Sequence, residues 1–506
     1  IPPKKIRVLA REIAMTKKVA LLTAWAPART NNADTWPQVF MTIGAMTGHI
    51  GQSGRMTGVS CWEYTANGGP ALVSSGGSGV PKLSPDPAPI SAKINNNEVW
   101  DAVLNGHYVA GFEDVRDINI QMIMHDGGSA LNQKVGMTRG IAAHRKVEFV
   151  VTSNFVLNTN AKYSDVVLPV TTQWERAGYV KGNREHLIWA RQVTQPLFEA
   201  KDDEWIATQL ADRLGVDSSL IAPLSTMQQV FNQLAGATVV ADDGVTKEPL
   251  LTITDADIAE MGVEGAAQTG RIPLQEMKTK GFYQVPRSPD DNLGYIAHAA
   301  FRQDPEANPL ATTTGKLEIY CVENVNFVKN SGFNEILPIP TYNRPMEGYE
   351  DSFSDWDNRV KSDFPLQLVT FHYRRRSHSM LDSVPWLREL FPQDFWMNPI
   401  DAEPLGLATG DVVKVSSRHG VVLRHVFLTT RILPGVVALG EGAWAQVDEA
   451  SGIDMAGATN TLNGAIPTGQ GHQGWNTCNV KVEKYEGSLN LEQDFTWAPR
   501  ATFEEV

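Results

Sequence analysis

The chain has 506 residues, of which 42% are hydrophobic and 20% charged, so it can bury substantial cores, and its length predicts about three domains. Its net charge of −13 argues against a surface that collects phosphate backbones or anionic lipid, and we expect no nucleic acid as a partner. The three cysteines, Cys61, Cys321 and Cys478, are too far apart to indicate a disulfide framework or a metal cluster.

The beginning of the chain predicts an amphipathic helix. Prolines at positions 2 and 3 are followed by apolar residues at helical spacing, namely Ile6, Leu9, Ala10 and Ile13. No initiator Met or signal segment is present, and no apolar stretch approaches the roughly 20 residues that cross a bilayer. We therefore expect a truncated or processed chain without a signal or transmembrane segment, whose membrane anchor, if it needs one, belongs to a partner.

A strand, a loop and a helix are predicted next. The apolar run 19–22 indicates the strand, residues 23–33 the loop, and Asp34 is the expected N-cap of the helix. The inner face of this helix is expected to carry Val39, Phe40, Ile43 and Met46. The following segment, rich in Gly, Ser and Pro as far as Pro89, is typical of a surface excursion.

Three apolar runs separated by short helical patterns predict a parallel sheet. The strands are expected at 118–124, 148–152 and 166–168, with a helix at 138–144. Continuous apolar strands of this kind belong to sheets that helices cover on both faces. A further helix is expected at 202–214, ended by Gly215. Its inward residues are expected to be Trp205, Ile206, Leu210 and Leu214.

The second half of the chain changes character twice. Residues 226–340 indicate a loop-rich stretch with a few short helices, and 340–363 a linker. After Phe364, short strands are expected at 366–371, 411–416, 421–428 and 436–439, separated by Gly and Pro turns. The predicted fold class is therefore α/β, with parallel-sheet domains covered by helices, followed by a C-terminal β-barrel domain.

Two features near strand ends could bind a phosphate-bearing cofactor. The Gly127–Gly128 turn would let backbone N–H groups cradle a phosphate, although a plain tight turn also explains a glycine pair. Trp25 could stack on a flat ring and Arg29 could pair with phosphate oxygens; a core Trp and a surface Arg are the alternative.

Two further groups of polar residues lie in the predicted barrel. The run 371–379 carries three arginines and two histidines, a density that favours a neutralising anion, with a solvated basic loop as the alternative. Several Asn and Asp residues could read the edge of a purine or simply occupy turns. The residues alone thus predict a large α/β protein with a β domain that binds a phosphate-bearing cofactor.

Several segments spread over nearly the whole chain carry a family pattern. They are 23–29 (TAWAPAR), 46–51 (MTGHIG), 160–169 (NAKYSDVVLP) with Glu175, 396–402 (WMNPIDA) before Gly410, 432–436 (ILPGV) and 439–444 (LGEGAW). In this order they resemble the molybdopterin oxidoreductases, and most closely the dimethyl sulfoxide reductase family. Ser129, Val369 and Cys478 depart from the residues usual in that family.

The resemblance implies a domain division and a cofactor. Residues 1–115 would be the remainder of a Rossmann-like α/β cofactor domain, 116–360 a second α/β domain with a loop-rich extension and linker, and 361–506 a C-terminal β-barrel molybdopterin dinucleotide-binding domain. The cofactor would be molybdenum held by two molybdopterin guanine dinucleotides. The residues expected to contact it are Trp25, Arg29, Gly127, Gly128, Asn154, Arg376, His378, Ser379, Asn398, Asp401, Asn460 and Asn479.

The family's [4Fe-4S] cysteines and its molybdenum ligand are expected only in a missing N-terminal region, so no catalytic or metal-ligating residue is assigned. The resemblance implies part of the catalytic subunit of a reductase that takes an oxygen atom from S-oxides or N-oxides such as dimethyl sulfoxide in anaerobic respiration. The fragment alone is expected to be inactive. An iron-sulfur electron-transfer subunit, a membrane anchor subunit and a location on the periplasmic face of the membrane are also implied.

Three alternatives remain open at this point. One is a relative that acts on another substrate, such as selenate or an aromatic hydroxyl. Another is a non-catalytic cofactor-binding module. The third is a nicotinamide-dependent dehydrogenase, for which the chain lacks a Rossmann fingerprint.

Overall fold

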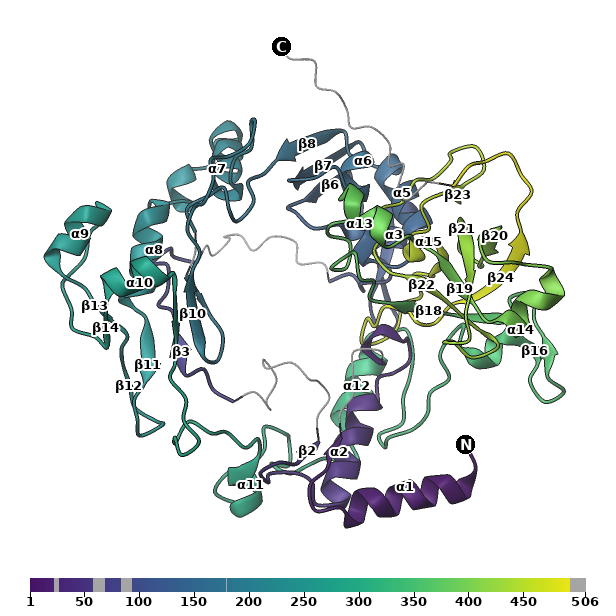
Figure 1. Cartoon of the computed structure of the whole chain (residues 1–506), viewed down its shortest axis with the longest axis horizontal. Helices are drawn as coiled ribbons and strands as arrows, with labels where there is room; N and C mark the ends of the chain where they lie inside the picture. The colour runs from purple at the N-terminus through teal and green to yellow at the C-terminus, as the bar shows by residue number, and fades with distance from the viewer. Residues whose placement is uncertain (22–26, 58–68, 83–92, 179, 492–506) are drawn as a thin grey trace.

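The computed structural model describes residues 1–21, 27–57, 69–82, 93–178 and 180–491. Figure 1 shows the elements arranged as a ring, with a C-terminal barrel on one side and a lobe of short strands opposite it. A parallel sheet lies at the top of this view, and the N-terminal helices lie at the bottom. Trp25 and Cys61 lie outside the described residues.

The N-terminal elements follow the predicted order but differ in detail. They are α1 (Pro3–Met15), β1 (Ala20–Leu21), η1 (Pro27–Arg29), α2 (Trp36–Met46) and β2 (Met56–Thr57). Asp34 is not the N-cap, because the helix begins after Thr35, and Asp34 is buried where Asn334 donates to its carboxylate over 3.4 Å. Met46 does not face inward, since its side chain is exposed. Helix α1 is amphipathic, yet Ile6 and Leu9 are exposed.

The parallel sheet has the order β6-β7-β8. Its strands are β6 (Met122–His125), β7 (Phe149–Asn154) and β8 (Val166–Pro169). The connecting helices are α4 (Ala130–Gln133), α5 (Met137–Lys146) and α6 (Thr159–Lys162). The first strand starts at Met122 rather than 118, because residues 118–121 connect it to the preceding hairpin and have no strand partner. That hairpin, β4 (His107–Gly111) and β5 (Asp114–Asp117), is antiparallel and was not predicted; helix α3 (Val99–Asn105) precedes it.

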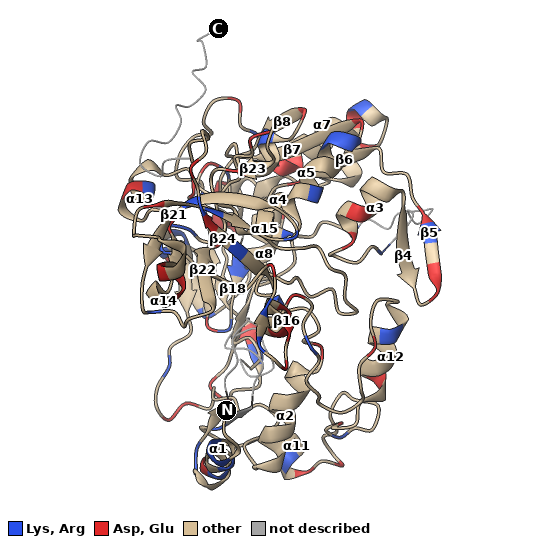
Figure 2. Ribbon diagram, turned by 90° about the vertical axis from the view of Figure 1, so that its right-hand side faces the viewer, with Lys and Arg blue, Asp and Glu red and all other residues tan. Residues whose placement is uncertain are grey.

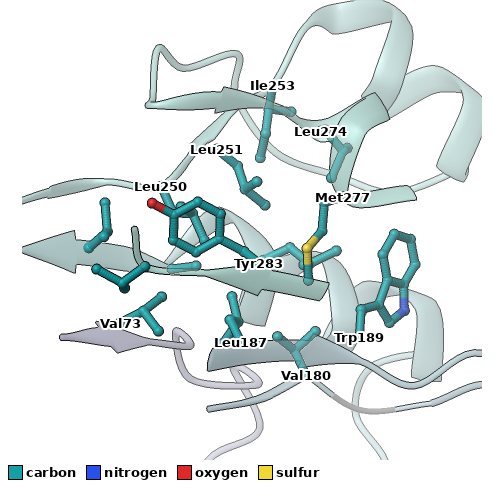
Figure 3. Close-up of a cluster of buried hydrophobic side chains, with 14 of the residues drawn as sticks. Val73, Val180, Leu187, Trp189, Leu250, Leu251, Ile253, Leu274, Met277 and Tyr283 are labelled. Atoms are coloured by element: carbon teal, nitrogen blue, oxygen red, sulfur yellow. The ribbon is translucent and has the colours of Figure 1, made fainter. Parts of the chain in front are cut away.

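A compact lobe occupies much of the region that was expected to be loop-rich. Its strands are β3 (Val73–Ser74), β9 (Val180–Gly182), β10 (His186–Trp189), β11 (Thr238–Val240), β12 (Lys247–Pro249), β13 (Leu251–Thr252), β14 (Ile272–Pro273) and β15 (Phe282–Gln284). Its helices are α7 (Asp203–Leu214), α8 (Thr226–Ala235), α9 (Asp255–Met261) and α10 (Leu274–Lys280). Figure 3 shows its core, in which Leu187, Leu250 and Met277 are fully buried.

Three predictions about this lobe were wrong. The stretch after residue 226 is structured, and the expected surface excursion supplies Leu72 and Val73 to the core, because β3 pairs with β11. Helix α7 ends at Gly215 as predicted, but Trp205, Leu210 and Leu214 are exposed and Ile206 is the inward residue of that set. Further elements are η2 (Ser218–Leu220), α11 (Ala299–Gln303) and α12 (Val322–Asn330).

The C-terminal region forms a closed barrel of six strands, which confirms the predicted fold class. The strands are β18 (Leu366–Phe371), β19 (Phe395–Met397), β20 (Val412–Ser416), β21 (Val421–Leu428), β22 (Val436–Gly440) and β24 (Asn479–Lys484), with β23 (Ile453–Asp454) added beside β21. Pairing of β19 with both β22 and β21 closes the barrel. Its interior is aliphatic, with Leu368, Val415 and Val437 fully buried.

Smaller elements complete the barrel. The predicted linker contains η3 (Tyr349–Ser352) and a short hairpin, β16 (Phe353–Asp355) and β17 (Val360–Lys361). The barrel also carries α13 (Pro385–Leu390), α14 (Pro399–Ala402), η4 (Glu403–Leu405) and α15 (Thr459–Leu462). The division of the chain at residues 115 and 360 stays a prediction.

Acidic and basic residues are interspersed over most of the ribbon, as Figure 2 shows, whereas α1 gathers several basic residues. Among the described residues, no helix combines the length and apolarity needed to cross a membrane.

Candidate cofactor site

The glycine turn lies at the carboxyl end of the parallel sheet, where ligands of such sheets bind. Gly127 and Gly128 follow β6 and have φ angles of +106° and +68°, a region that favours glycine. A Cβ atom built on Gly127 would have no neighbour within 4 Å, so the turn faces open space. The side chains of Asn154 and Asn158 each donate to the Gly128 carbonyl over 2.9 Å and hold the turn in place.

A histidine pair lies directly beneath this turn. His125 ends β6, and its Nε2 lies 2.9 Å from Nε2 of His144 on α5, with the two rings stacked. His144 Nδ1 donates to the Gly140 carbonyl, which leaves its Nε2 to accept from His125. Burial and the neighbouring His144 lower the pKa of His125 from 6.5 to about 4. The pair is therefore neutral at physiological pH.

The barrel contacts the same edge of the sheet. Asn132, on α4, donates to the Ala443 carbonyl over 2.7 Å, and Ala445 N donates to Thr159 Oγ1 on α6 over 3.2 Å. Asn460, on α15 of the barrel, donates to the Lys134 carbonyl over 2.7 Å. The strand ends that carry the glycine turn thus lie against the barrel.

The arginine-rich run finds its anion within the chain. Arg375, Arg376 and Arg388 surround the fully buried Asp382, with N–O distances of 3.1, 2.7 and 3.3 Å. Burial alone would raise the pKa of Asp382, but the charges of the three guanidinium groups outweigh burial and hold it well below its usual range. Arg376 also contacts Gln393 and the Glu441 carbonyl. The guanidinium of Arg376 thus holds the loop that precedes His378 against Gln393 and the backbone of Glu441.

Four polar side chains meet at the rim of the barrel beside that loop. Glu441 follows β22, next to the end of the parallel strand β18, and its Oε1 accepts hydrogen bonds from His372 and, over 3.0 Å, from His378. Arg29 pairs with Glu441 Oε2 over 3.3 Å and lies 5.8 Å from the centre of the Trp475 ring. The ligand atoms of the two histidines and Glu441 lie within 4.8 Å of one another.

The structure brings Arg29, His378 and Ser379 to one place, and Gly127, Gly128 and Asn154 to another. The indole Nε1 of Trp444 donates a hydrogen bond to the Ser379 carbonyl over 2.7 Å. Sequence reasoning missed Glu441 as a site residue, although the LGEGAW motif contains it. Its contacts with His372 and His378 span more than sixty positions, and no local pattern reports such a contact.

Asn398 and Asp401 have structural partners inside the barrel. Asn398 Oδ1 accepts from Ile400 N over 3.0 Å, and its Nδ2 donates to the Ile432 carbonyl over 2.7 Å. Asp401 accepts from Gly435 N over 2.7 Å. These bonds join α14 to the turn before β22. Contact of either residue with a cofactor stays a prediction, as it does for the other residues assigned from the sequence.

Buried polar atoms that fit a heterocyclic ligand lie between the end of α15 and the first residue of β24. Among the described residues, both side-chain polar atoms of Asn463, Oε1 of Gln473 and Oδ1 of Asn479 are buried without a hydrogen-bond partner. Buried polar groups are almost always paired in native proteins, so such a group of orphans indicates a missing ligand or water. Pterin and purine rings carry donors and acceptors on their edges, so these residues fit a pterin dinucleotide.

Comparisons with known proteins agree with this geometry. The family model described as "Molybdopterin oxidoreductase" matches residues 6–213, and that described as "Molydopterin dinucleotide binding domain" matches 366–477. The chain is 30% identical over 486 residues to the dimethyl sulfoxide reductase DmsA of Escherichia coli, a match that covers 92% of this chain and 53% of DmsA. It is 27% identical to a dimethyl sulfoxide/trimethylamine N-oxide reductase of Rhodobacter capsulatus, covering 99% of this chain and 58% of that protein.

A solved structure shows the same fold. The acetylene hydratase of Pelobacter acetylenicus superimposes with a TM-score of 0.53 at 18% identity, covering 77% of this chain and 46% of the hydratase. The chain thus spans about half the length of the curated relatives that it matches.

Proposed function

Because the chain belongs to the molybdopterin oxidoreductases of the dimethyl sulfoxide reductase family, we propose that it is part of the catalytic subunit of a molybdenum enzyme that removes the oxygen atom from an S-oxide or N-oxide. The observation that carries the cofactor assignment is the set of unpaired buried polar atoms at Asn463, Gln473 and Asn479, within or just beyond the segment that matches the dinucleotide-binding model. Support for the substrate class comes from relatives that are named as dimethyl sulfoxide and trimethylamine N-oxide reductases.

The residues of two places would hold the cofactor. Backbone N–H groups at Gly127 and Gly128 would receive a phosphate of one nucleotide, on a turn that Asn154 holds. Arg29 and His378 at the barrel rim would contact a pterin, together with the buried unpaired polar atoms of Asn463, Gln473 and Asn479. When bound, molybdenum with its pterins supplies two-electron redox chemistry, and the protein supplies orientation and electrostatics.

The residues of this chain have two tasks in such a reaction. Asp382 and its arginines fix the backbone around His378, so that the rim histidines are positioned before a ligand arrives. His372 and His378 share one carboxylate oxygen of Glu441, which orients both imidazole rings at the rim of the barrel.

The finer features of the proposal rest on the family resemblance. The dinucleotides would carry guanine, the [4Fe-4S] centre would lie outside this chain, and electrons would arrive from an iron-sulfur subunit that a membrane anchor subunit holds. The enzyme would work on the extracytoplasmic side of the membrane in anaerobic respiration.

The test measures molybdenum by mass spectrometry together with acid-released GMP, on this chain and on the complete gene product from metal-supplied anaerobic cells. We expect two GMP per molybdenum in the complete product. We also expect oxidation of a reduced viologen dye by dimethyl sulfoxide or trimethylamine N-oxide. A folded, metal-supplied product with neither molybdenum nor GMP would falsify the cofactor assignment. Turnover with selenate alone would overturn the substrate class.

A non-catalytic cofactor-binding module is the second candidate, because the chain covers only about half of its relatives. It predicts GMP and molybdenum in the complete gene product without turnover of any oxide. The same preparations and dye assay therefore separate the two candidates.

A further inference from the structure

One pocket of the molecule lies apart from both places assigned to the cofactor. It has a volume of about 170 Å³, and its walls are the turn 49–55, which follows α2, and the segment 295–298, which precedes α11. Figure 1 shows α11 beside β2 at the bottom of the ring. The two walls are in close contact, since a Cβ atom on Gly51 would lie 2.7 Å from the His298 carbonyl. At about 30 Å³ for each water molecule, the pocket has room for a tetrahedral oxyanion.

The turn offers a row of unused backbone donors. The N–H groups of residues 50–54 donate to no acceptor in the part of the chain that the structure describes. Gly51 and Gly54 have φ angles of +69° and +68°. Successive N–H groups in turns with such left-handed residues form concavities that bind anions. The turn therefore provides donors for the oxygens of an anion.

Three basic side chains surround the turn without a counter-ion. Arg55 and Arg302 both donate to the Gly48 carbonyl over 3.2 Å, which places two guanidinium groups side by side. Nζ of Lys18 would lie 3.4 Å from a Cβ atom on Gly54. None of the three has an ion-pair partner among the described residues, and no Asp or Glu lines the pocket. Like charges held this close repel one another, so an anion in the pocket would stabilise their arrangement.

His49 narrows the choice of anion. It is 1% exposed, and its Nε2 lies 2.7 Å from the Ile13 carbonyl. A carbonyl oxygen only accepts, so Nε2 carries the proton and Nδ1 of the neutral ring is an acceptor. Nδ1 is buried without a hydrogen-bond partner, although His49 lines the pocket. The ligand should therefore present anionic oxygens to the turn and one hydroxyl group to His49.

We propose that this pocket binds inorganic hydrogen phosphate. Its anionic oxygens would accept from the N–H groups of residues 50–54 and from Arg55, and its P–OH group would donate to Nδ1 of His49. Sulfate, and the pyrophosphate of a dinucleotide, have no such hydroxyl group at neutral pH, so the pocket is suited neither to sulfate nor to the proposed cofactor. The inference does not depend on the proposed substrate or on turnover.

Isothermal titration calorimetry of the complete gene product with inorganic phosphate tests the proposal. At pH 8 inorganic phosphate keeps one proton, and ordinary imidazoles are neutral. At constant ionic strength we expect one phosphate per chain, and sulfate should bind at least about tenfold more weakly because it leaves Nδ1 of His49 unpaired. Absence of phosphate binding at millimolar concentrations would overturn the proposal, as would sulfate binding of equal strength.

Methyl phosphate separates the shape of the ligand from its hydroxyl group. It resembles phosphate in shape, but it has lost its last proton at pH 8. We expect it to bind about as weakly as sulfate. Binding as tight as that of phosphate would mean that the pocket does not read the hydroxyl group, which contradicts the proposal.

Two variants of Arg55 test the charge of the pocket. Arg55→Gln should weaken phosphate binding by about tenfold, whereas Arg55→Lys keeps the charge and should lose less. The control is Arg213→Gln, because Arg213 also donates to a backbone carbonyl, that of Gln209, but lies on α7. Equal losses in Arg55→Gln and Arg213→Gln would mean that the overall charge of the protein attracts phosphate, and would exclude a site at the turn.

The variant His49→Leu removes the acceptor for the hydroxyl group. We expect phosphate and sulfate to bind this variant with similar, weak affinities. The ratio of two affinities measured on one preparation does not depend on the fraction of the protein that is folded. A preference for phosphate that survives in His49→Leu would overturn the role of His49.

Discussion

Three buried arginines share Asp382, and the negative charge of this residue neutralises them. Replacing Asp382 with Asn leaves three buried guanidinium groups without their counter-ion, and we expect a loss of about 3–5 kcal/mol in the free energy of unfolding. Urea denaturation followed by tryptophan fluorescence measures the loss. Asp411→Asn, which removes the charge of an exposed pair with Lys484 and leaves an amide oxygen that can still accept from Ala408 N, is the control and should change little. Equal effects of the two variants would contradict the role of Asp382.

The His125–His144 pair makes stability depend on pH. The pKa of His125 is about 4 in the folded chain against 6.5 in the unfolded one, so the unfolded chain binds more protons between these values. The contribution of His125 to the free energy of unfolding should therefore be fully present above pH 6.5 and should be lost as the pH falls toward 4. After allowance for partial exposure, this contribution is on the order of 1–2 kcal/mol.

The variant His125→Gln removes the titrating group and should flatten this dependence. Urea midpoints at pH 7 and pH 5 provide the comparison, with His107→Gln on the exposed end of β4 as the control. An undiminished pH dependence in His125→Gln would show that the pair does not cause it.

At the scale of elements, two glycine variants distinguish the effect of backbone strain from the effect of a blocked ligand contact at the glycine turn. Gly127→Ala introduces strain of about 1–2 kcal/mol at a positive φ, and its Cβ would occupy the open space where we place a phosphate. We expect released GMP per chain of the loaded protein to fall at least severalfold. Gly215→Ala, at φ +73° with equally open surroundings at the end of α7, also places an alanine at a positive φ but far from the turn, and should retain GMP. Similar GMP losses in both variants would mean that strain alone is responsible.

The length of an element decides whether the sequence reveals it. Strands β18 and β21, with six and eight residues, were predicted with their correct bounds, because apolar runs of that length between turn residues are distinctive. Strands β3 and β13 have two residues each, and their burial depends on partners that are distant in sequence. The lobe around Leu250 was therefore not predicted, although its core residues are as deeply buried as those of the barrel.

The candidate site follows the same rule. The arginine-rich run was visible as a local excess of charge, and the anion expected there was assigned to the cofactor, whereas Arg375 and Arg376 pair with a carboxylate of this chain. That Asp382 supplies this anion follows from the turn that brings residues 375–388 together, which local patterns do not encode. Glu441 belongs to the rim only because β18 and β22 are parallel neighbours.

At the scale of the whole molecule, a shared apolar cluster and several hydrogen bonds tie the parallel sheet to the barrel, and the amide of Asn460 makes one of these bonds. Asn460→Ala leaves the Lys134 carbonyl unpaired at a cost of about 1–3 kcal/mol, which should loosen this junction while the barrel stays folded. Hydrogen exchange of residues 130–137 should accelerate, whereas that of β20 should not. The control is Asn292→Ala, which removes an exposed hydrogen bond from the side-chain amide of Asn292 to the Asp242 carbonyl. Unchanged exchange at 130–137 would mean that other contacts carry the junction.

The closed barrel has its first and last strands side by side, since Leu366 of β18 pairs with Val480 of β24. The two ends of the barrel segment therefore lie close together, and segments with this arrangement tolerate circular permutation and insertion into other proteins. A gene could acquire or lose this segment as a cassette, with new ends cut into an outer turn, and the strands would still close.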